Sequence, residues 1–185
     1  MLPLGTVAPR FALPDTLSGR TVALEDLASS PALLIAFICN HCPFVKHILD
    51  GFVEFARDFA PRGLAVVAIS SNDAKTYPAD APAELRRIAT LKGFNFPYLY
   101  DESQEVAKVY QAVCTPDFFL FDQGRRLAYR GQFDGSRPGN SIPVTGTDLR
   151  TAAEALLRGS PVPSEQTPSV GCSIKWKAGR EPDWA

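Results

Sequence analysis

The sequence has no excess of charge of either sign and no apolar run long enough to cross a membrane. Lysine and arginine total 19 residues and aspartate and glutamate total 20, so the net charge is −1. This balance favours neither a nucleic-acid partner nor an anionic membrane surface. The longest apolar run, PALLIAFIC at residues 31–39, is far shorter than a bilayer-spanning helix. We therefore expect no nucleic-acid partner and no membrane partner.

A secretory signal is not predicted either. The start of the chain, MLPLGTVAPRFALPD, has no basic region followed by an apolar stretch, so the expected location is cytoplasmic. Cysteine is scarce, with 4 residues in 185. In a cytoplasmic protein, so few cysteines argue against a structural disulfide framework and for redox or metal chemistry.

The pattern of apolar residues predicts strands that alternate with helices. A turn-rich stretch separates residues 11–15 from 21–26, and these two segments are typical of a β-hairpin. Two continuous apolar runs, 32–38 and 64–70, predict strands that are buried on both faces. After the hairpin we expect, in chain order, a strand at 32–38, a helix at 43–59, a strand at 64–70, a loop at 71–82, a helix at 83–92, a strand at 96–101, a helix after Asp101 with Val106, Val109, Tyr110 and Val113 on its apolar face, strands at 118–122 and 126–131, and a helix from Thr147.

This order implies an α/β fold with a central mixed β-sheet flanked by helices. The crossover between 32–38 and 64–70 makes these strands parallel, and the closing hairpin adds antiparallel strands. Residues 1–159 are expected to form one domain, and residues 160–185 an extended, proline-punctuated C-terminal tail that packs on it. In such sheets the chemistry lies at the carboxyl ends of the strands.

The motif CNHC, residues 39–42, follows the first buried strand and precedes a helix. Unpaired N–H groups and the positive end of the dipole at a helix N-terminus stabilise a thiolate. Cys39 is thus a candidate nucleophile, and Cys42, one helical turn later, is placed to attack a mixed disulfide. His41 adds a positive charge or a hydrogen-bond donor beside the thiolate. The spacing therefore predicts a catalytic dithiol.

A zinc site is the alternative use of these residues. Structural zinc needs four ligands, usually with a second pair at ligand spacing. The remaining candidates, Cys114, Cys172, His41 and His47, contain no such pair. A C-x-x-C beside a βαβ pattern favours redox chemistry, and cysteines at a helix start in a cytoplasmic protein are reactive rather than inert. We therefore predict neither a metal nor another cofactor.

Three segments resemble the thioredoxin superfamily. GTVAPRFALPDTLSGRTVALEDLASSPALLIAFICNHCP, at residues 5–43, is similar to the opening of the peroxiredoxin-like and redoxin (AhpC/TSA-like) branch. VCTPDFFLFDQGRRLAYRG, at 113–131, resembles the superfamily's cis-proline segment and its last hairpin. With GCSIKWKAG at 171–179, the set resembles a group of peroxiredoxin-like thioredoxin-fold proteins. The resemblance implies a thioredoxin-like fold, a cis Thr115–Pro116 bond, and docking of a substrate's backbone at that loop.

The sequence departs from both kinds of enzyme that it resembles. If Cys42 is the peroxide-attacking residue, peroxiredoxins place a proline and a threonine where this chain has Ile35 and Cys39. Thioredoxins have a buried aspartate where this chain has Leu33. A histidine just before the second cysteine resembles the strongly oxidising DsbA type, in which it stabilises the thiolate.

Three functions stay open, and we rank them in the following order. The first is a thiol–disulfide oxidoreductase that uses the Cys39–Cys42 couple, with His41 tuning the thiolate. Its substrate, a disulfide-containing protein or a small thiol, would dock at Thr115–Pro116. The second is a thiol peroxidase in which Cys42 attacks a hydroperoxide and Cys39 resolves it. The third is a metal-handling module built on the motif, since two thiolates would suit copper(I).

Cys114 and Cys172 are candidates for an auxiliary redox role. Ile174 and Trp176 are large apolar side chains that a free tail would not need, so we expect the tail to pack on the domain. Packing would hold Cys172 in place. Two interpretations stay open: Cys172 is a small buried apolar residue, or it is a redox thiol that pairs with Cys114 or relays electrons to the C-x-x-C pair.

Overall fold

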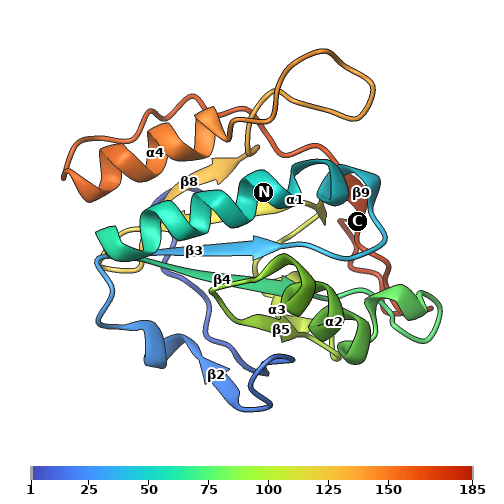
Figure 1. Cartoon of the computed structure of the whole chain (residues 1–185). Helices are drawn as coiled ribbons and strands as arrows, with labels where there is room; N and C mark the ends of the chain where they lie inside the picture. Colours follow the sequence, from blue (N-terminus) through green and yellow to red (C-terminus); the bar gives the residue numbers. More distant parts are fainter. Residues whose placement is uncertain (1, 185) are drawn as a thin grey trace.

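The computed structural model of the chain describes residues 2–184 and shows a sheet sandwiched between helices (Figure 1). The strands and helices in chain order are β1 (Ala12–Pro14), β2 (Thr21–Ala23), the 3-10 turn η1 (Leu24–Leu27), β3 (Ala32–Phe37), α1 (Pro43–Phe59), the 3-10 turn η2 (Ala60–Arg62), β4 (Leu64–Ser70), the 3-10 turn η3 (Pro78–Asp80), α2 (Pro82–Lys92), β5 (Tyr98–Tyr100), α3 (Glu105–Val109), β6 (Cys114–Thr115), β7 (Asp117–Phe121), β8 (Leu127–Gly131), α4 (Thr147–Leu157) and β9 (Cys172–Ser173). The predicted α/β class, with an N-terminal hairpin and a central mixed sheet, is confirmed.

The central sheet has five strands in the order β5-β4-β3-β7-β8. β3 and β4 are parallel, as are β4 and β5, whereas β7 runs antiparallel to both β3 and β8. Every residue of β3 is buried, because both faces of the sheet are covered. β3 therefore delivers its carboxyl end, and the CNHC motif that follows, to the middle of one sheet edge.

The two faces of the sheet belong to two separate hydrophobic cores. On one face, Leu34 of β3 packs with Phe52 of α1 and Leu149 of α4. On the other face, Ile35 packs with Tyr110, which follows α3. Neighbouring residues of β3 enter different cores because side chains alternate along a strand.

α1 carries the end of the motif, and its packing fixes that position. Proline suits the first helical position, because its φ is preset and its missing N–H is not needed there, so the helix begins at Pro43. Phe52, Phe55 and Phe59 recur on one face and are each at most 1% exposed. The rings of Phe55 and Phe59 stack with their centroids 4.6 Å apart. The helix is thereby held against the sheet along its length.

Two predicted segments differ from the structure. The helix after Asp101 ends at Val109, because Gln111 has a positive φ of 50° and the chain leaves the helix there. Val113, which was expected on the buried face, is 40% exposed. The predicted loop at 71–82 contains η3, whose Asp80 is fully buried.

The tail runs back over the domain, as Ile174 and Trp176 predicted. The side-chain oxygen of Gln166 accepts a hydrogen bond from the backbone N–H of Arg130 in β8 at 2.8 Å. The tail therefore covers the outer edge of the sheet. Farther along, β9 pairs with β6 in an antiparallel register. Ile174 is 3% exposed, and Trp176 packs against the second core. Packing of the tail is confirmed, whereas the boundary at residue 159 stays a prediction.

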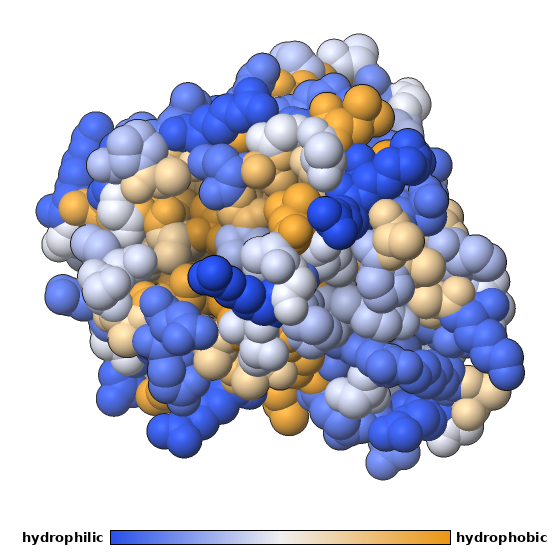
Figure 2. Space-filling view, turned by 60° about the horizontal axis from the view of Figure 1, so that its bottom comes forward, coloured by the Kyte–Doolittle hydropathy of each residue, from blue (hydrophilic) through white to orange (hydrophobic). Residues whose placement is uncertain are grey.

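On the face that Figure 2 shows, apolar groups lie between polar side chains and do not form one broad apolar patch. Among the exposed apolar residues, Leu91 belongs to α2, Ile142 to a loop and Val170 to the tail. Single exposed apolar residues are normal on folded proteins. No helix within residues 2–184 is both long and apolar enough to cross a bilayer.

Candidate active site

Cys42, rather than Cys39, occupies the N-terminal end of α1. β3 ends at Phe37, and Cys42 is the N-cap residue of the helix, with extended backbone angles of φ −65° and ψ 125°. The Cys42 side chain makes no capping hydrogen bond, and the nearby backbone N–H of Val45, in the first helical turn, helps to lower the pKa of Cys42. The expectation that Cys39 lies at the helix start is wrong, because the helix begins only after Cys42.

Both thiols of the motif are buried and lie against Thr115. Cys39 is 1% exposed and Cys42 is 0% exposed. Thr115 Oγ1 lies 3.3 Å from Cys39 Sγ, and Cys42 Sγ lies 3.1 Å from Thr115 O, to which its thiol form donates. The two cysteine side chains also hydrogen-bond to each other. The site is therefore a pair of buried sulfur atoms that both contact Thr115.

The two thiols differ in acidity, a point that the sequence left open. The hydrogen bond from the Cys39 thiol lowers the pKa of Cys42. The N–H groups of Val45 and Cys172 and the Cys172 thiol act in the same direction, against the effect of burial. The same bond between the pair raises the pKa of Cys39, as do burial and the negative charge of Asp80. Cys42 is therefore the more acidic thiol of the pair.

A buried carboxylate, Asp80, holds the motif from the side of η3. Its Oδ1 accepts the backbone N–H groups of Asn40 at 2.7 Å and His41 at 3.2 Å. Its Oδ2 lies 2.5 Å from Nδ1 of His41 and accepts the side-chain amide of Asn72 at 2.8 Å. Three hydrogen bonds thus fix the CNHC turn, and a fourth ties Asp80 to Asn72. Asp80 supplies a buried carboxylate even though Leu33 stands where thioredoxins carry theirs.

His41 belongs to the same network and lies beside Cys39. Its ring stacks on Tyr77 with the centroids 5.0 Å apart. Cys39, His41 and Asp80 bring one sulfur, one nitrogen and one oxygen atom within 4.8 Å of one another. The sequence indicated His41 but missed Asp80 and Tyr77, because both lie in a segment with the composition of an ordinary loop. No local signal marks Asp80, which becomes buried through contacts across 39 residues.

The Thr115–Pro116 bond is cis, as predicted. The backbone of β6 at this loop was expected to dock an extended substrate. In the structure that backbone already pairs with β9, and Thr115 lies opposite Cys172. The predicted docking at Thr115 and Pro116 therefore conflicts with the conformation described, because the chain's own tail occupies the edge.

Of the two candidate auxiliary cysteines, Cys172 is the one that acts on Cys42. It pairs with Thr115, whose carbonyl oxygen lies 3.1 Å from Cys42 Sγ, and its N–H and thiol both lower the pKa of Cys42. Cys114 instead donates to Pro116 O at 3.6 Å, and burial raises the pKa of its thiol to about 12. The strand register places Cys172 opposite Thr115 rather than opposite Cys114.

The cluster of Cys39, His41 and Asp80 is the candidate metal-ligand group that residues 2–184 offer. Both oxygens of Asp80 already accept two hydrogen bonds each, one of them from the ring of His41. A metal ion would have to replace bonds that hold the turn. His47, a further zinc candidate, bonds to Ser136 Oγ at 2.7 Å. The arrangement is better suited to hydrogen bonding than to binding a metal ion.

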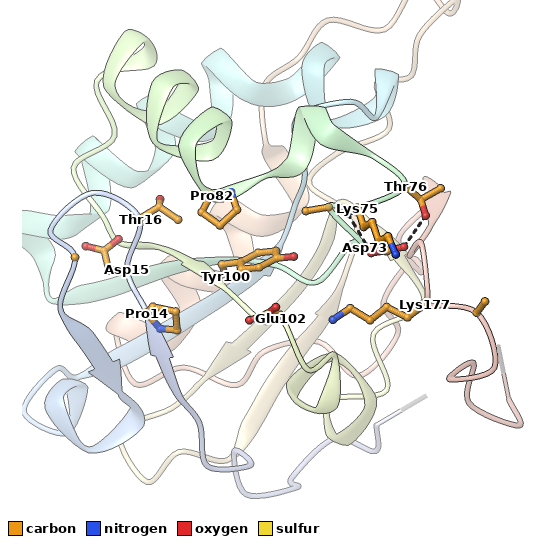
Figure 3. Close-up of a pocket in the computed structure, with 13 residues that line it drawn as sticks. Pro14, Asp15, Thr16, Asp73, Lys75, Thr76, Pro82, Tyr100, Glu102 and Lys177 are labelled. Atoms are coloured by element: carbon orange, nitrogen blue, oxygen red, sulfur yellow. Dashed lines mark hydrogen bonds between the residues drawn. The ribbon is translucent and has the colours of Figure 1, made fainter.

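A cleft of about 1180 Å³ lies between the N-terminal hairpin, the loop after β4 and the tail. Figure 3 shows Tyr100 at its centre and the amino group of Lys177 directed toward Glu102. Asp73, at the other side, accepts the hydroxyl of Thr76 at 2.6 Å. Its lining contains no cysteine and no histidine. We therefore place the candidate active site at the buried thiols and not in this cleft.

Comparisons with known proteins agree with this geometry. The model of the AhpC/TSA family matches residues 4–130. No curated protein matches the chain. The crystal structure of an uncharacterized conserved protein from Geobacillus kaustophilus is 56% identical in sequence. It aligns over 97% of this chain and 95% of its own, with a TM-score of 0.95.

Two structures of lower identity share the fold. A proposed thiol:disulfide interchange protein, DsbE, from Chlorobium tepidum is 23% identical over 85% of this chain and 99% of its own, with a TM-score of 0.65. Peroxidoxin BcpB from Mycobacterium tuberculosis is 20% identical over 86% of this chain and 98% of its own, with a TM-score of 0.63. These likenesses confirm the thioredoxin-like fold.

Proposed function

Because this chain belongs to the AhpC/TSA family, we propose that it is a thiol–disulfide oxidoreductase that uses Cys39 and Cys42 as a dithiol/disulfide couple. Members of this family are typically oxidoreductases that act on thiols, disulfides or peroxides. One observation carries the proposal: the two buried thiols of one C-x-x-C motif lie against Thr115 at the start of α1, with Cys39 Sγ 3.3 Å from Thr115 Oγ1 and Cys42 Sγ 3.1 Å from Thr115 O. The interaction between the two side chains lowers the pKa of Cys42 and raises that of Cys39. An attacking thiolate and a proton-bearing resolving thiol are what disulfide exchange requires.

Each exchange reaction has two steps. The Cys42 thiolate attacks one sulfur of a substrate disulfide, a bond forms between the two sulfur atoms, and the other substrate sulfur leaves as a thiolate. Cys39 then loses its proton and attacks Cys42 Sγ. The Cys39–Cys42 disulfide forms, the mixed disulfide breaks, and the second substrate thiolate leaves. Two electrons pass from the protein to the substrate, and an external dithiol returns them by the reverse steps.

His41 and Asp80 are the groups that handle the Cys39 proton. While Cys42 is a thiolate, the bond between the thiols and the charge of Asp80 keep the proton on Cys39. Once the mixed disulfide forms, Cys42 carries no charge, so the bond that held this proton is lost. The ring of His41, fixed by Asp80, is then the base within reach of Cys39.

A thiol peroxidase is the second candidate, because the acidic thiol lies at the N-cap of α1. The Cys42 thiolate would take one peroxide oxygen and become a sulfenic acid, with release of an alcohol or water. Cys39 would then condense with it to a disulfide and release water. This function ranks second because Ile35 and Cys39 stand where a peroxiredoxin places its proline and threonine. The metal-handling function ranks third, because Asp80 and His41 already bond to each other.

For location we propose the cytoplasm, where thiols are kept reduced. The proposed substrate is a disulfide-containing protein or a small thiol. The tail over β6 favours a small substrate as long as the tail stays in place.

Insulin-disulfide reduction and hydrogen peroxide consumption by the full chain test the proposal. With dithiothreitol as donor, the wild-type protein should reduce insulin, C42S should lose the activity, and C39S should accumulate a mixed disulfide. C114S is the matched control, since Cys114 is a buried neighbour that bonds to Pro116 and should leave activity unchanged. Peroxide turnover faster than disulfide exchange would reverse the ranking. Insulin reduction that C42S leaves unchanged would reject the assignment of the thiolate.

A further inference from the structure

The tail segment that follows Gly171 is built into the active site. A Cβ atom at Gly171 would lie 2.0 Å from Thr115 O, so only glycine lets the tail pass this close to the cis-proline loop. The N–H of Lys175 donates to Asn72 Oδ1 at 2.8 Å, and the same Asn72 donates to Asp80. Ile174 between these points is buried. The tail is thus tied to the network that holds the CNHC turn.

The position of Cys172 in this segment puts Cys42 between two thiols. Cys42 Sγ lies 3.1 Å from Thr115 O, Thr115 pairs with Cys172 across β6 and β9, and Cys172 packs against the core cluster that contains Cys39 and Cys42. Cys39 and Cys42 are at most 1% exposed, whereas Cys172 is half-buried. A molecule arriving from solvent therefore meets the sulfur of Cys172 before those of the motif.

We propose that Cys172 is a third catalytic cysteine, which exchanges with the Cys39–Cys42 disulfide to form a Cys42–Cys172 disulfide that external thiols reduce. This inference rests on the proposed function and extends it. Packing of Cys172 against the cluster that contains Cys42, next to Thr115, is the placement that a Cys42–Cys172 disulfide requires. Cys172 becomes the point at which electrons enter the buried site.

The exchange balances without a further oxidant. The Cys172 thiolate attacks Cys42 Sγ in the Cys39–Cys42 disulfide, the Cys42–Cys172 bond forms, and Cys39 leaves as a thiolate. Cys39 takes up the proton that Cys172 released. An external thiol then attacks Cys172 Sγ, and Cys42 leaves as the thiolate that its hydrogen bonds stabilise. A second thiol completes the reduction, so two external thiols become one disulfide.

Disulfide mapping in the full-length C39S variant tests the pairing. Trypsin places Cys42 in peptide 21–46, Cys114 in 109–125 and Cys172 in 159–175, so each pairing gives a distinct linked peptide. After oxidation with one equivalent of diamide, we expect 21–46 linked to 159–175. C39S/C114S should give the same link, and C39S/C172S should give no such link. A link between 109–125 and 159–175, or no link to 159–175, would overturn the proposal.

Rates of reduction separate this proposal from the function on which it rests. With the Cys39–Cys42 disulfide formed first, reduction by glutathione should slow by about tenfold in C172S and should not change in C114S. Equal reduction of C172S and wild type would reject Cys172 as the entry point and leave the Cys39–Cys42 couple intact. Failure of the wild-type protein to form the Cys39–Cys42 disulfide would reject the proposed function itself.

Discussion

At the scale of single residues, hydrogen bonds give two cysteines of one motif opposite properties. The Cys39 side chain lowers the pKa of Cys42. The negative charge of Asp80 raises the pKa of Cys39 and is not among the groups that set the pKa of Cys42. The nearby N–H of Val45, in the first turn of α1, also lowers the pKa of Cys42. The spacing of the two cysteines in the sequence does not distinguish their pKa values. The difference comes from the groups around each sulfur.

The acidity of Cys42 predicts a thiolate at neutral pH. The ultraviolet absorbance of the thiolate should be present in the wild-type protein at neutral pH and disappear only as the medium is made strongly acidic. Because the pKa of Cys42 is lower in the folded protein than in the unfolded chain, this ionisation stabilises the fold above the ordinary thiol pKa. The stabilisation is lost as the pH falls through the lowered pKa of Cys42.

Titration of that absorbance in wild type, C42S and C114S checks this prediction. C42S should lose the signal at neutral pH, and C114S should retain it, because burial keeps Cys114 protonated there. In C39A the pKa of Cys42 should rise, since the thiol that lowers it most is removed and alanine offers no donor in its place. A neutral-pH signal that survives in C42S would assign the thiolate to another cysteine.

Asp80→Asn tests the buried carboxylate with little change in volume. The amide cannot accept at both ends of the side chain, so some of the four hydrogen bonds, three from the turn and one from Asn72, are lost, at a cost of about 1–3 kcal/mol in the free energy of unfolding. The pKa of Cys39 should fall, because the nearby negative charge is gone. Asp122→Asn, in the turn between β7 and β8, is a control that removes a carboxylate elsewhere.

The measurement uses both variants in a C42S background, where Cys39 is the remaining thiol of the motif. Alkylation of Cys39 as a function of pH, read by mass spectrometry of peptide 21–46, reports its pKa. D80N should move the curve to lower pH, and D122N should not. Identical curves for D80N and the parent would show that Asp80 has no electrostatic effect on the thiol.

At the scale of elements, the β6–β9 pair is what closes the site. Each strand has two residues, and their pairing brings the tail against the loop that contacts both thiols. Two-residue strands form few backbone bonds, so the pair depends on flanking contacts such as those of Asn72 with Lys175 and of Gln104 with Lys175. An element this small is a natural point for opening.

Gly171→Ala should open this pair. The added methyl group would meet the backbone oxygen of Thr115, which belongs to the cis-proline loop and cannot rotate away as a side chain could. We expect β9 to separate from β6 and Cys42 to become accessible to alkylation. Gly135→Ala is the matched control, since its Cβ would meet only the side-chain methyl of Ile142 at 3.6 Å, an ordinary contact.

The rate of alkylation of Cys42 at neutral pH measures this opening. G171A should react faster than wild type, and G135A should react at the wild-type rate. Hydrogen exchange should show a matching loss of protection at Ile174, whose N–H bonds to Val113 O in the wild type. Unchanged alkylation and exchange in G171A would mean that the loop accommodates the methyl group without releasing the tail.

At the scale of the whole molecule, a buried ion pair joins the last two strands of the sheet behind the site. Arg130 of β8 lies 3.3 Å from Asp117 of β7, and both side chains are at most 5% exposed. Arg130 also donates to Gln111 O at 2.7 Å, and its guanidinium lies over the ring of Phe119. Burial raises the pKa of Asp117, and the charge of Arg130 opposes that rise.

Arg130→Met should destabilise the whole fold by about 3–5 kcal/mol, because it leaves the Asp117 charge buried and unpaired. The raised pKa of Asp117 in the folded state means that its contribution is most favourable at low pH and is lost as the pH rises through that pKa. The loss in R130M should therefore be smaller in acid than at neutral pH. Urea unfolding at both pH values checks the sign.

The double variant Asp117→Leu/Arg130→Met provides the control for this prediction. Replacing both partners removes the unpaired charge, so the double variant should be more stable than R130M at neutral pH. A double variant that is less stable than R130M would show that the two charges are not coupled and that the loss has another origin.

Local patterns in the sequence by themselves determined the elements and the place of the motif. The apolar run at 32–38 indicated a doubly buried strand, and the spacing of Phe52, Phe55 and Phe59 indicated one face of a helix; both signals depend on residues within a few turns of each other. The resemblance added the cis bond at Thr115–Pro116. Ile174 and Trp176 predicted a packed tail from composition alone.

Only the tertiary structure decided which thiol is acidic, which carboxylate orients His41 and which cysteine reaches Cys42. Asp80 is 39 residues from His41, and Lys175 is 103 residues from its partner Asn72. Hydrogen bonds over such separations leave no period in the sequence, because a polar residue in a loop looks the same whether it is solvated or buried. The acidity of a thiol depends on the donors around its sulfur, and the fold places those donors from α1, the cysteine turn and the tail at a single point.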